Sequence, residues 1–115
     1  MRKAVRVAGV FLLLAAMVVF AGSAEAGVIT IFNNSGQDIY EVYISSSDAS
    51  DWGRDLMPEY FLKHGQTHQV TTPRYNEFDL MIVDGRGNKT DWYGIPGNVV
   101  RFYVDPNKQA RWEWN

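Results

Sequence analysis

The stretch FDLMIVDGRGNKTDWY, residues 78–93, decides the fold class of this 115-residue chain. Its first six residues alternate in the way expected for a strand with two different faces. Residues 84–88 then contribute Asp, Asn and two Gly, the residue types that favour tight turns. Because a second strand-like segment follows, the stretch predicts a β-hairpin that joins 78–84 to 88–93.

The same pattern extends outward from this hairpin in both directions along the chain. Short β-rich segments alternate with turn residues, and nothing after residue 26 shows a convincing helical period. We therefore expect an all-β fold, an antiparallel sandwich or small barrel of about seven strands, with an immunoglobulin-like order among the alternatives. Two more hairpins are predicted, 28–33 with 38–45 and 99–104 with 109–114. The seventh strand is expected over 66–72, which ends at a proline.

Residues 1–26 have the three parts of a secretory signal peptide. A basic start is followed by an apolar run over 7–21 and by small residues that fit a cleavage site ending at Ala26. The run is shorter than the ~20 residues that a membrane-spanning helix needs, so no stable membrane insertion is expected after cleavage. The sequence thus predicts a periplasmic or secreted protein whose mature part, 27–115, is a single β domain.

Charge and cysteine content exclude several classes of function. The predicted leader holds three of the 11 basic residues and one of the 13 acidic ones, so the mature part carries 8 and 12, a net charge of −4. It shows no cluster of Lys and Arg of the kind that binds phosphate backbones, and nucleic acid is not an expected partner. The chain has no cysteine, which excludes disulfides, thiolate metal sites and a cysteine nucleophile.

A long segment, residues 46–65, interrupts the strand pattern. It contains Asp48, Asp51 and Asp55, whose oxygen atoms are ligands that Ca²⁺ prefers, although their spacing does not match an EF-hand loop. No cofactor other than calcium is suggested. The alternative is that Ser50 or Asp51 accepts backbone N–H groups at the start of one helical turn over 51–57, and that Asp55 pairs with Arg54 or another basic residue.

Aromatic residues supply the remaining functional hint. Trp52 could fill the core beneath the long segment or contact a ligand, and the neighbouring Gly53 is expected to adopt a positive φ. Trp112 and Trp114 alternate with Ala110 and are expected to face the core. The remaining aromatics could bind a protein or a carbohydrate. The candidate binding residues are Trp52, Gly53, Asp55, Tyr60, Tyr75 and Tyr93.

The sequence favours a binding role over an enzymatic one. No serine lies in a nucleophile-elbow motif, no catalytic residue can be assigned, and a mature chain of 89 residues with seven strands leaves little room for a deep substrate cleft. The leading hypothesis is a non-enzymatic binding module of the bacterial envelope. A calcium-stabilised structural module is the alternative, and a small hydrolase ranks below both.

Two short motifs resemble those of small exported bacterial β-domain proteins of unknown function. One is an N-x-[ST]-G turn, here residues 33–36. The other is a loop of the W-G-x-D-x-L type, here residues 52–56, in which the leucine directly follows the aspartate. A strand with the pattern [FY]-D-L follows at residues 78–80. The resemblance covers most of 31–95 and implies a periplasmic or secreted single β domain, without any catalytic residues.

Overall fold

The computed structural model describes residues 26–57 and 59–114, and these residues form a β-sandwich. The predicted signal peptide lies outside the described residues except for Ala26. Among the described residues no helix is long and apolar enough to cross a membrane. The elements are β1 (Ala26–Asn33), β2 (Ile39–Ser46), β3 (Thr67–Pro73), β4 (Glu77–Asp84), β5 (Lys89–Pro96), β6 (Val99–Val104), the 3-10 turn η1 (Pro106–Lys108) and β7 (Ala110–Trp114).

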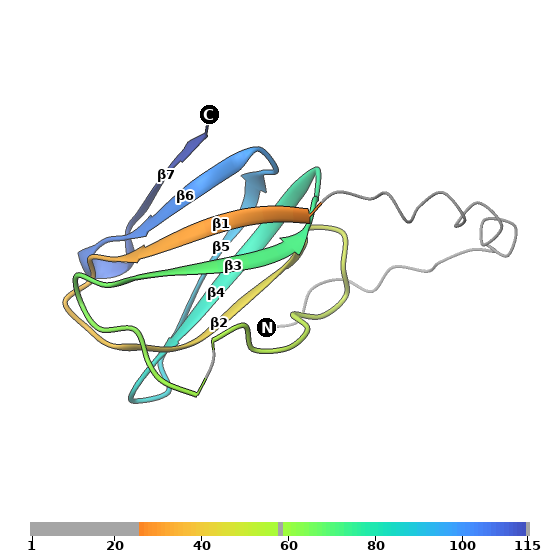
Figure 1. The fold of residues 1–115 in the computed structure, drawn as a ribbon. Coiled ribbons are helices and arrows are strands. Elements are labelled where there is room, and N and C mark those ends of the chain that lie inside the picture. Colours follow the sequence, from red (N-terminus) through yellow and green to blue (C-terminus); the bar gives the residue numbers. More distant parts are fainter. Residues whose placement is uncertain (1–25, 58, 115) are drawn as a thin grey trace, which may run out of the picture.

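The seven strands form two sheets, which confirms the predicted all-β sandwich (Figure 1). The four-stranded sheet has the order β3-β1-β6-β7, and the three-stranded sheet has the order β2-β4-β5. β1 runs parallel to β6 and antiparallel to β3, so the first strand lies between partners that are distant in sequence. An immunoglobulin domain instead pairs its first two strands, so that alternative does not hold.

Two of the three predicted hairpins are confirmed. β4 pairs with β5 across the turn at residues 84–88, and β6 pairs with β7. In the first of these turns the Asp84 carboxylate accepts N–H groups from Arg86 and Asn88, at 2.8 and 2.9 Å. This is the local hydrogen bonding that makes Asp a good turn residue.

The predicted hairpin of 28–33 with 38–45 is wrong, because β1 and β2 lie in different sheets. The turn residues between them form a crossover organised by Asn33, whose side chain is only 1% exposed. Its amide donates to the carbonyls of Gln37 and Leu62 at 2.7 and 2.8 Å, and its Oδ1 accepts two hydrogen bonds from Ser35. Because of this crossover, β1 and β2 bury their apolar faces in the same core from opposite sides.

The core lies between the two sheets, and β4 is its most buried strand. All six residues from Phe78 to Val83 are buried, whereas the edge strands alternate. The inward-facing side chains of β4 belong to a core cluster that also includes residues of β1, β2, β3, β5 and β6. The members of this cluster on the strands are Ile29, Ile31, Ile39, Val42, Ile44, Val70, Phe78, Leu80, Ile82, Ile95, Val99, Phe102 and Val104.

The side loop, residues 47–66, closes one side of the sandwich between β2 and β3. Leu56 N–H donates to the carbonyl of Val42 in β2 at 2.7 Å, and Ile39 and Leu62 exchange two hydrogen bonds of 2.9 Å. On the other sheet, a ring nitrogen of His68 in β3 lies 3.4 Å from the carbonyl of Leu56. The loop thereby covers the edge of β2, which would otherwise be open to other strands.

The helical turn expected over 51–57 is absent, since none of these residues is helical. The reason is that the N–H groups of this segment find acceptors elsewhere. Leu56 bonds to β2, and Met57 N–H donates to the side chain of Asp55 at 2.9 Å. These bonds replace the i to i−4 ladder that a helix would need.

Candidate functional site

One hollow in the described residues is a cleft at one end of the sandwich, named here the loop cleft. It has a volume of about 460 Å³ and lies where three connections meet, at residues 35–38, 84–88 and 105–108. This volume falls within the range of small-molecule sites. The lining residues are Ser35, Gln37, Asp38, Ile39, Ile82, Asp84, Asn88, Thr90, Trp92, Val104, Asp105, Pro106, Asn107 and Lys108.

The floor of the loop cleft is the end of the hydrophobic core. Ile39, Ile82 and Val104 are buried members of the core cluster and also line the cleft. Trp92 is only partly buried, and its ring meets that of Phe102 edge-on, with 5.2 Å between the ring centroids. The cleft therefore offers an aromatic and aliphatic surface beneath a polar rim.

Three carboxylates stand at the rim, and two of them are held within their own connections. Hydrogen bonds from Asn88, first from its backbone and then from its side chain, lower the pKa of Asp84. Asp105 forms an ion pair of 2.7 Å with Arg111, which, together with a bond from Asn34, lowers the pKa of its carboxyl group. Asp38 makes no hydrogen bond or ion pair with the described residues and stays available to a ligand.

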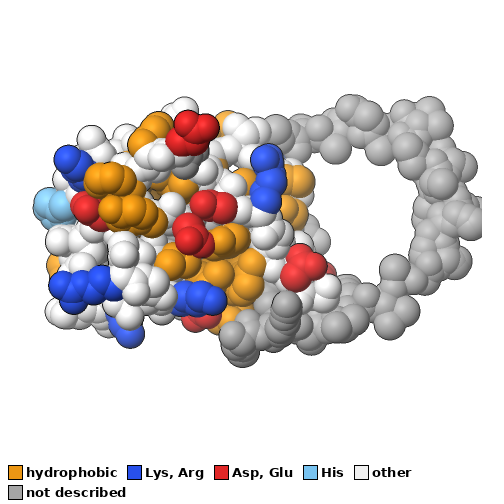
Figure 2. All heavy atoms as spheres, turned by 90° about the horizontal axis from the view of Figure 1, so that it is seen from below, with side chains coloured by type: hydrophobic (Ala, Val, Ile, Leu, Met, Phe, Trp, Pro, Cys, Tyr) orange, Lys and Arg blue, Asp and Glu red, His pale blue; other side chains and the backbone are white. Residues whose placement is uncertain are grey.

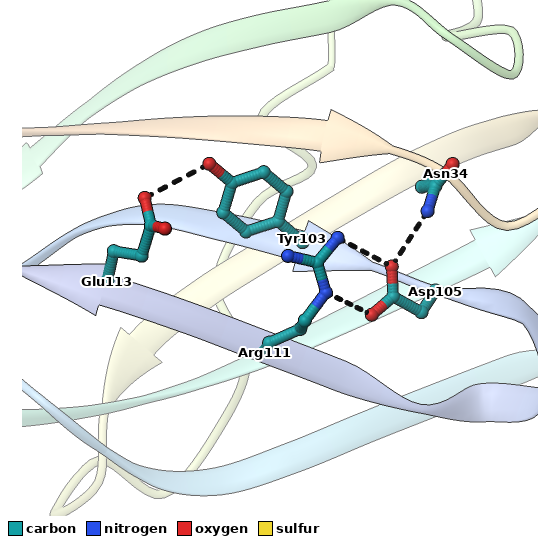
Figure 3. A network of polar contacts seen from close by, with 5 residues as sticks. All are labelled: Asn34, Tyr103, Asp105, Arg111 and Glu113. Atoms are coloured by element: carbon teal, nitrogen blue, oxygen red, sulfur yellow. Dashed lines mark hydrogen bonds and ion pairs between the residues drawn. The ribbon is translucent and has the colours of Figure 1, made fainter.

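A network on the outer face of the four-stranded sheet fixes the position of Asp105 (Figure 3). The Arg111 guanidinium lies 4.3 Å from the centre of the Tyr103 ring, which in turn stacks on Phe32. The Tyr103 hydroxyl donates to Glu113 at 3.1 Å. Each exposed ion pair contributes little by itself, but together these contacts hold the β6–β7 connection at the mouth of the cleft.

That connection also contains two residues with positive φ. Asn107 has a φ of 61° and Lys108 a φ of 63°, so both adopt the left-handed conformation that side chains disfavour. Both residues line the loop cleft. Strain of this kind gathers at functional sites, where the surrounding structure maintains it.

Replacing Lys108 by glycine is expected to increase the free energy of unfolding by about 0.5–1 kcal/mol, because glycine adopts a positive φ without a steric cost. Chemical denaturation of the two proteins measures the difference. Gln109→Gly is the matched control and should destabilise the domain, since Gln109 has a φ of −93°. A Lys108→Gly variant less stable than the parent would contradict the assignment of strain.

The candidate residues Trp52 and Tyr93 come together on the outer face of the three-stranded sheet. Their rings lie 5.8 Å apart between centroids. Trp52 is partly buried and is not among the core residues, so it does not fill the core as one interpretation required. Gly53 has a φ of +77°, as predicted.

Two tyrosines on this outer face donate to carboxylates two residues earlier in the same strand. Tyr43 donates to Glu41 at 2.5 Å, a bond that, with burial, raises the pKa of Tyr43 to about 12. Tyr93 donates to Asp91 at 3.2 Å, and its pKa is raised chiefly by burial. The carboxylates of Glu41 and Asp91 are therefore each hydrogen-bonded to a tyrosine of the same strand.

The three aspartates of the suggested calcium site do not converge. Within the described residues, no three His, Cys, Asp or Glu side chains gather closely enough to hold a metal ion. Asp51 accepts the N–H of Gly53 at 3.2 Å, and Oδ1 of Asp55 accepts the N–H groups of Val42 and Met57. Asp51 therefore accepts a backbone N–H as the alternative expected, although no helical turn follows it, whereas Asp55 accepts backbone N–H groups and forms no ion pair with Arg54 in the described residues.

The other aromatic candidates lie far apart in the fold. Tyr60 is exposed in the side loop, where its ring lies edge-on to that of His68. Tyr75 packs against the core between β3 and β4, and burial raises its pKa. Trp112 stacks on Phe102 as expected, but Trp114 is 53% exposed and does not face the core.

Sequence reasoning missed the role of Asp79, which is 2% exposed on β4. Its Oδ1 accepts the hydroxyl of Ser47 at 2.7 Å and the N–H of Gly94 at 2.9 Å. These bonds tie the start of the side loop to an irregular part of β5. The available signal was an acidic residue inside an otherwise apolar strand, which requires buried partners.

Charged side chains are scattered over the face shown in Figure 2. On the face shown in Figure 2, the Lys and Arg side chains lie apart from one another, while acidic side chains lie among apolar ones. This face carries no continuous basic surface.

Comparison with known proteins finds a solved structure with a similar fold. No protein-family model matches the sequence, and no curated protein matches it. The structure is similar to that of a protein from Eubacterium rectale determined by NMR, with a TM-score of 0.54 and 13% sequence identity. The similarity covers 78% of this chain and 88% of the other. At this identity the similarity supports the sandwich architecture and nothing further.

Proposed function

We propose that this chain is an exported, non-enzymatic binding module whose loop cleft takes a carbohydrate or a similar polyhydroxylated small molecule. The observation that carries this proposal is the composition of the cleft. A partly exposed tryptophan and core aliphatic side chains form its floor, and carboxylate, amide and hydroxyl groups form its rim. A few polar groups above an apolar surface are typical of small-molecule sites.

A sugar ring matches this arrangement because it has an apolar C–H face and a polar edge. The Trp92 ring and the neighbouring Ile82 would take the C–H face, in the same way that aromatic side chains accept other apolar surfaces. Asp38, Gln37 and Asn88 line the rim and would accept or donate hydrogen bonds to the hydroxyl groups.

The non-enzymatic role is supported by the state of the rim carboxylates. Hydrolysis of a glycosidic bond needs two carboxyl groups that are both available to the substrate. In the loop cleft Asp84 is bound within its own turn and Asp105 is paired with Arg111. Asp38 then stands without a second carboxyl group to complete such a pair.

Export rests on the sequence, through the basic start, short apolar run and small-residue cleavage site of residues 1–26. The strands that the structure describes begin with β1 at Ala26, the last residue of that segment.

The proposal is tested by NMR titration of the 27–115 chain with a panel of neutral, amino and acidic monosaccharides and disaccharides. We expect amide shifts confined to residues 35–39, 84–92 and 104–108, with dissociation constants of about 0.1–10 mM. Asp38→Ala should weaken sugar binding without lowering the stability of the domain, because Asp38 makes no hydrogen bond or ion pair with the described residues. Trp114→Ala is the matched control and should leave binding unchanged.

Two results would overturn the proposal. One is the absence of localised shifts for every sugar at ~10 mM. The other is binding that maps to a different surface, such as the ring pair of Trp52 and Tyr93, and is unaffected by Asp38→Ala.

A further inference from the structure

We propose that two copies of this chain associate through β7, which joins their four-stranded sheets into one continuous eight-stranded sheet. β7 ends its sheet, and among the strands that the structure describes none pairs with its outer edge (Figure 1). An edge strand presents a row of backbone donors and acceptors that another strand can use. This association is independent of the loop cleft.

The other edges of the sandwich are less suited to pairing. The side loop covers the edge of β2 through its bonds to Val42 and Ile39. β3 ends in Pro73, and β5 contains Pro96, a positive φ at Gly94 and an irregular register with β4. Proline and irregular geometry are features that protect edges against pairing.

The hydrogen bonding of the β6–β7 hairpin decides which groups of β7 face outward. At the turn, Asp105 N–H donates to the Gln109 carbonyl at 2.8 Å. In an antiparallel pair, hydrogen-bonded and non-hydrogen-bonded residue pairs alternate. Arg111 and Glu113 therefore bond to β6, while the N–H and C=O groups of Ala110, Trp112 and Trp114 point to the open edge.

A two-fold axis perpendicular to the sheet requires the central residue of β7 to pair with its own copy. With Trp112 at the centre, Arg111 lies opposite Glu113 of the partner subunit, and Ala110 lies opposite Trp114 of the partner subunit. Centring on Arg111 or on Glu113 would place like charges opposite each other, which is destabilising.

This register would also cover apolar surface that a single copy leaves open. Trp112 is only partly buried where it stacks on Phe102, and Trp114 is 53% exposed. Pairing brings both tryptophans against the partner strand. Complementary charges on the outer face and tryptophans along the same edge favour a second copy as the occupant.

Sedimentation velocity of the 27–115 chain over a range of concentrations tests the proposal. We expect a monomer–dimer equilibrium, which Ala110→Pro should abolish. The Ala110 N–H points to the open edge, and proline is tolerated at the first residue of a strand, so this variant should fold as a monomer. Circular dichroism and thermal melting confirm that it has folded.

Exchanging the charges of Arg111 and Glu113 distinguishes contacts between subunits from contacts within one chain. Arg111→Glu and Glu113→Arg each place like charges opposite each other at two symmetric positions, and each should weaken dimerisation about tenfold. The double variant restores opposite charges between subunits although it breaks both pairs within the chain, with Asp105 and with Arg101. It should therefore dimerise almost as well as the parent.

Three results would overturn the proposal. The first is a parent chain that stays monomeric at the highest concentration. The second is a dimer that Ala110→Pro leaves intact, and the third is a double variant that associates more weakly than either single one. A monomeric parent whose β7 amides shift on addition of a synthetic strand peptide would assign the edge to a different chain.

Discussion

Replacing Asp79 by alanine is expected to lower the free energy of unfolding by about 3 kcal/mol, because two partly buried hydrogen bonds to a charged acceptor are lost. The Ser47 hydroxyl and the Gly94 N–H both donate to Oδ1 of Asp79, and Asp79 is only 2% exposed. For a domain of about this size, that loss corresponds to a fall in melting temperature of about 12–24 °C. Differential scanning calorimetry measures it directly.

Asp79→Asn is the matched control. Asparagine keeps an oxygen at the Oδ1 position, so both bonds can form, although a neutral acceptor gives weaker bonds than a carboxylate. We expect this variant to lose about 1 kcal/mol. If Asp79→Ala were as stable as the parent, the carboxylate would have no structural role, and a buried acid in β4 would need another explanation.

Strand positions could be predicted because alternation is local information. All seven strands occur within a few residues of the predicted segments, and the turns at 84–88 and 105–109 connect the predicted partners. The pairing of β1 with β6 could not be predicted in this way. It depends on Asn33 directing the chain across to the other sheet, through bonds to residues as distant as Leu62.

The candidate site was harder to predict than the fold. The loop cleft combines side chains from three connections that are separate in sequence, and only the fold brings them together. Sequence reasoning instead selected residues 46–65, where acidic and aromatic residues lie close together along the chain. Proximity in sequence placed Trp52 and Asp55 in one loop, but they have different partners, Tyr93 and β2.

The N-x-[ST]-G turn, the loop of the W-G-x-D-x-L type and the [FY]-D-L strand contain three polar residues with a common structural role. Asn33, Asp55 and Asp79 each accept hydrogen bonds from backbone N–H groups at a place where the chain changes direction or meets another element. Such residues determine the fold of a small domain that has no disulfides. This explains how three distinctive polar residues can lie outside the lining of the cleft.

The second large effect is expected at Asp55. Replacing Asp55 by alanine should lower the free energy of unfolding by about 2 kcal/mol, because the N–H groups of Val42 and Met57 both donate to its Oδ1. The local loss of stability should be greatest at the edge of β2. Hydrogen exchange measured by NMR should show faster exchange of the Val42 and Leu56 amides, while the amides of β6 change in proportion to global stability only.

Asp55→Asn distinguishes this capping role from the calcium hypothesis. An amide oxygen can still accept both N–H groups, so a capping residue tolerates asparagine with a loss of about 0.5 kcal/mol. A calcium ligand would lose a negative charge from its site, and the parent protein would also be destabilised by excess chelator. A small effect of Asp55→Asn, with a melting temperature that chelator does not change, supports the cap. A large effect of both treatments would support the metal, and it would require Asp48, Asp51 and Asp55 to rearrange, since these three carboxylates form no metal-binding group in this structure.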